Sequence, residues 1–92
     1  MEVKHEYKTS QMYGGVTVEY DYEISDNGYK HLWSMTYTKG ERKAVVVFCY
    51  GNSNWGRSNA YMTPINPTGR TRSYKDRENA KAKAYEFVTA TS

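Results

Sequence analysis

Residues 16–48 read VTVEYDYEISDNGYKHLWSMTYTKGERKAVVVF, and apolar or aromatic side chains alternate in them with polar ones. Alternation with a period of two residues is typical of strands that have one buried and one exposed face. It is interrupted at Asn27-Gly28 and at Lys39-Gly40. Asn-Gly favours a two-residue hairpin turn because both residues tolerate a positive φ. This stretch therefore predicts three antiparallel strands joined by two hairpins.

The alternation continues toward the N-terminus, where Gly14-Gly15 marks a third turn. We expect four strands in all, at about residues 2–9, 15–25, 29–38 and 42–50. Two-residue loops at the three turns would put the apolar side chains of all four strands on one face. One row of that face would contain Tyr7, Tyr22, Trp33 and Val46, and the next row Thr9, Tyr20, Met35 and Ala44. A slip of one residue would mix the faces, so this register should be strongly specified.

The other face of the predicted sheet has an apolar corner at the fourth strand. It consists of Leu32, Val45, Val47 and Cys49. Because a bare apolar edge strand invites aggregation, we expect the corner to be covered. The cover would be either residues after 50 of the same chain, including a short strand near Tyr61, or another protein. The chain would accordingly be a monomer, or a homodimer through the fourth strand.

Residues 51–72 are rich in Gly, Asn, Ser, Thr and Pro, and we expect long loops there. Ser73 is the predicted N-cap of a helix over about residues 74–89, with Asp76 and Glu78 in the first turn. One face of this helix carries Ala80, Ala84, Phe87 and Val88. We therefore predict a single α+β domain: a four-stranded antiparallel β-meander, long loops, and one C-terminal α-helix packed on the sheet.

Length and composition indicate how many domains the chain forms and which classes of protein it does not belong to. Ninety-two residues are enough for one domain, residues 1–92, and ten Tyr, two Trp and two Phe supply much of its core. One Cys excludes an intramolecular disulfide. The N-terminus does not resemble a signal peptide, and the longest apolar run, 44–50, is too short to span a bilayer. We expect a cytoplasmic protein without membrane contact.

The sequence predicts neither a metal site nor an active site. His5 and His31 share a row of the predicted sheet with Ile24 between them, and Cys49 is on the other face, so no third metal ligand is near. The remaining acidic candidates form a solvated stripe on one strand, namely Glu19, Asp21 and Glu23. Acid–base catalysis needs environments that separate the pKa values of two groups, and an exposed stripe offers none. We expect a non-enzymatic protein without cofactor.

Residues 50–61 have the composition of a binding loop, because Tyr, Ser, Gly and Asn surround one Trp and one Arg. Trp, Tyr and Arg are also the residue types enriched in interface hot spots. The predicted partner-binding residues are Tyr50, Asn52, Asn54, Trp55, Arg57 and Tyr61. In the alternative interpretation, Trp55 folds back onto the apolar corner beside Val45 and Val47.

Positive charge is concentrated in the second part of the chain. Residues 1–50 hold seven acids and six bases, whereas residues 51–92 hold three acids and seven bases. Guanidinium groups near a helix N-terminus suit a phosphate or a carboxylate. The predicted anion-binding or nucleic-acid-binding residues are Arg57, Arg70, Arg72, Ser73 and Lys75.

The plan of hairpins at Asn27-Gly28 and Lys39-Gly40 followed by a helix from Ser73 resembles the small inhibitor proteins that phages make, including anti-CRISPR proteins. The resemblance implies a non-catalytic inhibitor that docks on a host protein or nucleoprotein surface, in the host cytoplasm if a phage encodes the chain. Many such inhibitors are acidic mimics of nucleic acid, whereas this chain is basic, which favours docking on an acidic surface. The alternative hypothesis is a small nucleic-acid-binding domain that contacts phosphates through residues 57–83.

Overall fold

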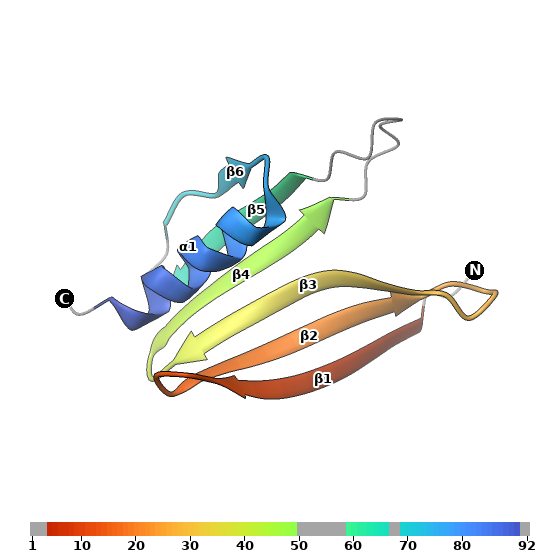
Figure 1. Cartoon of the computed structure of the whole chain (residues 1–92), viewed down its shortest axis with the longest axis horizontal. Coiled ribbons are helices and arrows are strands. Elements are labelled where there is room, and N and C mark those ends of the chain that lie inside the picture. The colour runs from red at the N-terminus through yellow and green to blue at the C-terminus, as the bar shows by residue number, and fades with distance from the viewer. Residues whose placement is uncertain (1–3, 50–58, 67–68, 91–92) are drawn as a thin grey trace.

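The computed structural model describes residues 4–49, 59–66 and 69–90. These residues form one antiparallel sheet with strands in sequence order and one helix packed on it (Figure 1). The elements are β1 (Lys4–Met12), β2 (Val16–Ile24), β3 (Lys30–Lys39), β4 (Arg42–Cys49), β5 (Asn59–Asn66), β6 (Arg72–Tyr74) and α1 (Arg77–Thr89). The predicted α+β fold with a C-terminal helix on an antiparallel sheet is confirmed, but the sheet has six strands rather than four.

The core lies between α1 and the sheet face that α1 covers, which we call the helix face. The buried apolar residues are Val16, Val18, Met35, Tyr37, Ala44, Val46, Phe48, Ala60, Met62, Ala80, Ala84 and Val88. The prediction that Ala80, Ala84 and Val88 face the sheet is therefore confirmed, and their small size lets the helix approach a sheet with bulky side chains. The other face, the open face, carries Thr36 and Val45, and no helix formed by the described residues covers it.

Of the two additional strands, β5 comes from residues predicted as loops, with a short strand near Tyr61 as one option, and β6 overlaps the predicted start of the helix. In β5, Ala60, Met62 and Pro64 are buried, so this segment alternates with a period of two in spite of its Asn and Pro residues. β5 pairs with β4, where Val47 lies opposite Tyr61. The chain thus covers the edge of the fourth strand by itself, through a strand that contains Tyr61. Within the described residues, β4 pairs with β3 over Arg42–Val47 and with β5 over Lys43–Cys49.

The predicted register of β1 is wrong by one residue. Tyr7 lies opposite Asp21 and not opposite Tyr22, so Tyr7 is on the open face and is 60% exposed. The reason is the turn between β1 and β2, which uses Tyr13 as well as the two glycines. Because side chains alternate along a strand, one extra loop residue moves every side chain of β1 to the other face.

In the hairpin between β2 and β3, the pairs farthest from the turn have the predicted register, and Tyr20 lies opposite Met35 there. A bulge beyond Asp21 then pairs Tyr22 with Leu32 instead of Trp33. Leu32 therefore packs against the core rather than belonging to an apolar corner of the open face, and Trp33 is 43% exposed.

In the hairpin between β3 and β4, the side chains of β4 lie on the predicted faces, but the pairing of β4 with β3 is shifted by two residues from the predicted register. Met35 lies opposite Val46 and not Ala44, because the loop residues are Gly40-Glu41 and not Lys39-Gly40. Gly40 has a φ of 60° at the first loop position. A glycine with positive φ at that position is typical of the type II′ hairpin turn.

The helix begins three residues later than predicted. Asp76, and not Ser73, is the N-cap, and its carboxylate accepts a hydrogen bond from the Glu78 backbone N–H at 3.0 Å. Ser73 lies in β6, opposite Tyr61. Pairing with β5 keeps the backbone of residues 72–74 extended, which is incompatible with a helical first turn at residue 74.

Candidate functional site

A groove of about 510 Å³ separates α1 from the edge of the sheet formed by β5 and β6. Its walls carry three cations and one carboxylate, which are Arg70, Arg72, Lys83 and Glu86. Its apolar part is formed by Met62, Pro64, Phe87 and Ala90. The groove therefore combines positive charge with an apolar floor.

The chain reversal between β5 and β6 positions the two arginines. Gly69 donates a backbone hydrogen bond to the Pro64 carbonyl at 3.1 Å, and a Cβ at position 69 would lie 3.0 Å from the Pro64 ring. Only glycine fits this close approach without displacing Pro64. Arg72 then pairs with Met62, a helix-face residue, so its side chain lies on the side of the sheet that carries α1.

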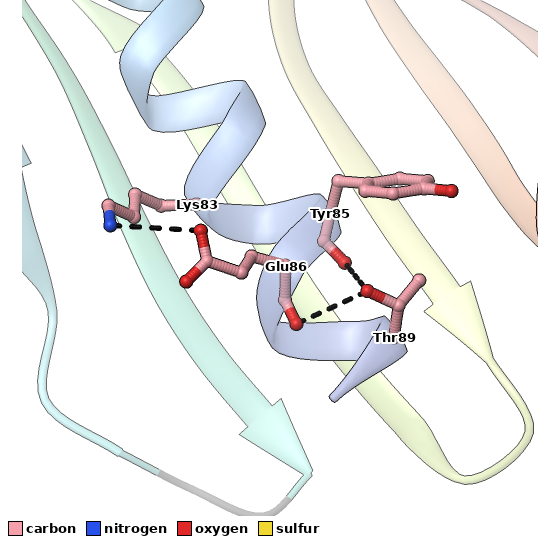
Figure 2. A network of polar contacts seen from close by, with 4 residues as sticks. All are labelled: Lys83, Tyr85, Glu86 and Thr89. Carbon is pink, nitrogen blue, oxygen red and sulfur yellow. Dashed lines mark hydrogen bonds and ion pairs between the residues drawn. The ribbon is translucent and has the colours of Figure 1, made fainter. Parts of the chain in front are cut away.

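The third cation comes from the helix. Figure 2 shows Lys83 and Glu86 on one side of α1 and Tyr85 on the other. Lys83 Nζ lies 3.7 Å from a Glu86 carboxylate oxygen, and the Glu86 side chain is 72% exposed. Such a long, exposed pair is weak, so Lys83 remains available to an incoming anion.

The last turn of α1, which borders the groove, is stabilised by its own residues. Thr89 Oγ1 donates to the Tyr85 carbonyl at 2.8 Å and approaches the Glu86 carbonyl at 3.3 Å (Figure 2). On the far side of the helix, the Tyr85 hydroxyl donates to the Tyr13 carbonyl at 2.7 Å. The Thr89 contacts hold the last helical turn together, and the Tyr85 hydrogen bond connects the helix to the turn between β1 and β2.

The electrostatics of the groove favour an acidic ligand. Among the described residues, no carboxylate lies within 4.0 Å of the Arg70 or Arg72 guanidinium. A guanidinium binds a carboxylate or a phosphate through two parallel hydrogen bonds. The apolar floor of Met62 and Phe87 would accommodate an apolar group beside the anion.

The structure brings together only part of the predicted anion site. Arg70 and Arg72 line one groove, whereas Ser73 lies opposite Tyr61 on the open face and Lys75 is exposed before the helix. The expected role of Ser73 at a helix N-terminus is wrong, because the Asp76 carboxylate occupies that position. Arg57 lies outside the described residues.

Lys83 is the last residue of the range 57–83 that was predicted to contact phosphates, but it was not among the named anion-binding residues. Lys83, Phe87 and Ala90 are spaced so that they share one helix face, and this spacing was the available signal. Which strand that face meets depends on β6, however, and β6 was not predicted.

Most of the predicted partner-binding loop lies outside the described residues. The residues concerned are Tyr50, Asn52, Asn54, Trp55 and Arg57. Tyr61 is described. It is 38% exposed on the open face, so it lies on the other side of the sheet from the groove.

The two histidines differ from their predicted arrangement because of the shifted β1 register and the β3 bulge. His5 and His31 both pair with Glu23, not with Ile24. His5 Nδ1 lies 2.6 Å from an Asp21 carboxylate oxygen, so Asp21 is not simply solvated. Among the described residues, no three His, Cys, Asp or Glu side chains are grouped as metal ligands.

Comparisons with known proteins give no relative: no family model, no curated protein and no solved structure matches this chain. Within residues 4–49, 59–66 and 69–90, no helix is long and apolar enough to cross a membrane.

Proposed function

We propose that this chain is a non-catalytic binding protein that docks on an acidic surface of a protein or nucleoprotein partner through the groove between α1 and β6. The observation that carries the proposal is that Arg70 and Arg72 line the same groove as Lys83 while no described carboxylate pairs with either arginine. The apolar floor distinguishes the groove from a purely electrostatic patch, and it favours an acidic segment that also carries apolar side chains.

The mode of action that we propose is occupancy of the partner's surface, as in the small phage inhibitors, including anti-CRISPR proteins, that the chain resembles in plan. Two features of the charge distribution support an acidic partner. The chain carries a net charge of +3. In addition, the cations of the groove come from three separate positions in the sequence but point into one space.

A defined probe tests the groove before any partner is known. The probe is a fluorescein-labelled peptide of alternating Glu and Leu, and its binding is followed by fluorescence anisotropy in 50 mM salt. We expect Arg70→Ala with Arg72→Ala to weaken binding at least tenfold with an unchanged melting temperature. The matched control is Lys43→Ala with Lys75→Ala, which removes the same charge from exposed residues that do not line the groove.

Equal weakening by the groove variant and by the control variant would show that net charge, and not the groove, binds the peptide. Binding by neither the peptide nor a nucleic acid would contradict the proposal.

A nucleic acid is the second candidate partner, because the three groove cations are of the type that contacts phosphates. The open face argues against it, since Glu19, Asp21 and Glu23 would repel a phosphate backbone that contacted this face. Mixed-sequence single-stranded DNA in the same assay decides between the two partners. Affinity for DNA that exceeds affinity for the peptide and falls steeply between about 50 and 200 mM salt would favour the nucleic acid.

A further inference from the structure

The two edges of the sheet differ in what they offer to another protein. β6 forms one edge and has only three residues, whereas β1 forms the other edge and has nine (Figure 1). β1 pairs with β2 along its whole length without a bulge, and α1 makes no contact with β1 among the described residues. A long, regular edge strand presents a row of unpaired backbone N–H and C=O groups.

We propose that β1 pairs with β1 of a second copy of this chain, antiparallel and about a two-fold axis at Tyr7. The two sheets would then be continuous, with both helices on the same face. A two-fold interface requires that the strand be complementary to itself. The side chains of β1 meet this requirement in one register.

In the register centred on Tyr7, each Glu6 lies opposite Lys8 of the second copy, so two pairs of opposite charge flank the axis. Directly opposed unlike charges stabilise an antiparallel pair, and like charges destabilise it. A register centred on Lys8 would set Lys8 against its own copy, and one centred on Glu6 would set two carboxylates together. The charges of β1 thus favour the register at Tyr7 over its two neighbours.

The aromatic side chains of the open face are arranged consistently with this register. Tyr7 is 60% exposed at the middle of the edge strand, and its ring stacks on His5 with centroids 6.1 Å apart. Across the proposed axis, the two Tyr7 rings would be direct cross-strand neighbours, which is a stabilising aromatic pair. Pairing would therefore place the two exposed Tyr7 rings side by side and remove part of their surface from water.

The contacts that Glu6 and Lys8 make within their own chain leave both side chains able to pair with a second copy. Glu6 binds Lys30 Nζ at 2.7 Å, but its side chain remains partly exposed, and a carboxylate can accept hydrogen bonds from two ammonium groups. Lys8 Nζ lies 5.8 Å from the centre of the Tyr22 ring, on the helix face with Glu6. The groove is at the opposite edge of the sheet, so dimerisation would leave both grooves open and make the assembly bivalent.

Charge exchange tests the pairing and its register. The association of the full chain is measured by sedimentation equilibrium from about 1 μM to 1 mM. Glu6→Lys and Lys8→Glu each replace the two unlike pairs by like pairs, so each should weaken self-association at least tenfold. An equimolar mixture of these two variants restores both unlike pairs and should form a heterodimer. The double variant, which exchanges the charges, should associate like the wild type.

Thermal melts serve as the folding control. If Glu6→Lys fails to fold because Lys30 loses its partner, the comparison of the wild type with Lys8→Glu, which keeps Glu6, still decides. A wild type that is monomeric at 1 mM would overturn the proposal. So would a Lys8→Glu variant that dimerises as strongly as the wild type, or a mixture that forms no heterodimer. The peptide assay of the groove does not depend on any of these outcomes.

Discussion

Arg42, the first residue of β4, binds Phe87 in the last turn of the helix in two ways. Its Nε donates a hydrogen bond to the Phe87 carbonyl at 2.8 Å, and its guanidinium lies 4.5 Å from the centre of the Phe87 ring. The helix has no basic residue in its own last turn. Arg42 therefore supplies from the sheet the positive charge that favours a helix C-terminus.

Arg42→Ala should lower the free energy of unfolding by about 2 kcal/mol, because it removes a charge-assisted hydrogen bond and a cation–π contact. Urea denaturation measures this change. Arg42→Lys keeps the charge without the planar donor and should lose about half as much. Because Phe87 also lines the groove, Arg42→Ala should also weaken binding of the acidic peptide. Unchanged stability in Arg42→Ala would show that the contact is not formed in solution.

Asp76→Ala should destabilise the protein by about 1 kcal/mol through loss of the helix N-cap. Ser73→Ala is the matched control, since Ser73 is the residue that the sequence pattern favoured as the cap and the structure places in β6. Thermal unfolding of the two variants should differ by several degrees. The opposite order of the two melting temperatures would place the cap at Ser73.

The faces of β2, of β4 and of the part of β3 beside the β3–β4 turn were predictable from the sequence because period-two alternation is a local property, whereas the bulge that exchanges Leu32 and Trp33 was not. Val46 and Met35 were assigned to the buried side from this pattern alone, and both are buried. The lengths of the loops were harder to predict from the sequence. Gly14-Gly15 indicates a turn, but the pattern does not show whether Tyr13 belongs to the loop or to the strand, and this one residue decides which face of β1 is exposed.

The groove was only half predictable for a related reason. Arg70 and Arg72 stood out as a local cluster of charge. Lys83 joins them through the packing of α1 beside β6, which is a tertiary contact that no local pattern encodes. β5 was predicted only as the option of a short strand near Tyr61, because the Asn and Pro content of residues 59–66 outweighed the alternation of Ala60 and Met62.

Gly14→Ala should destabilise the protein more than Gly28→Ala by about 1 kcal/mol. Both glycines have a positive φ, of 86° and 81°, so both substitutions cost backbone energy. A Cβ at position 14 would also lie 3.0 Å from the Tyr85 hydroxyl oxygen, whereas a Cβ at position 28 would meet no atom within 4 Å.

The larger loss of stability in Gly14→Ala should arise because the new Cβ displaces the Tyr85 hydroxyl and weakens its hydrogen bond to the Tyr13 carbonyl. In a Tyr85→Phe background, the difference between the two glycine variants should therefore shrink. If it stays the same in urea denaturation, Tyr85 does not hold the turn between β1 and β2.

Tyr37 makes the stability of the protein depend on pH in the alkaline range. Its side chain is 1% exposed, and burial raises its pKa to about 12, with a smaller contribution from Tyr20 and Glu78. The unfolded chain loses this proton near the ordinary pKa of about 10. The stabilisation is complete below pH 10 and is lost as the pH rises from 10 to 12, because only the unfolded state ionises there.

The loss should amount to about 3 kcal/mol in total, since the pKa differs by about two units and each unit corresponds to about 1.4 kcal/mol. Urea denaturation at pH 8, 10 and 11 compares the wild type with Tyr37→Phe, in which the phenol is absent. The stability difference between the two should move in favour of Tyr37→Phe as the pH increases. Tyr29→Phe, which removes an exposed hydroxyl, is the control. A difference that is independent of pH would mean that the Tyr37 phenol ionises equally easily in the folded and unfolded states.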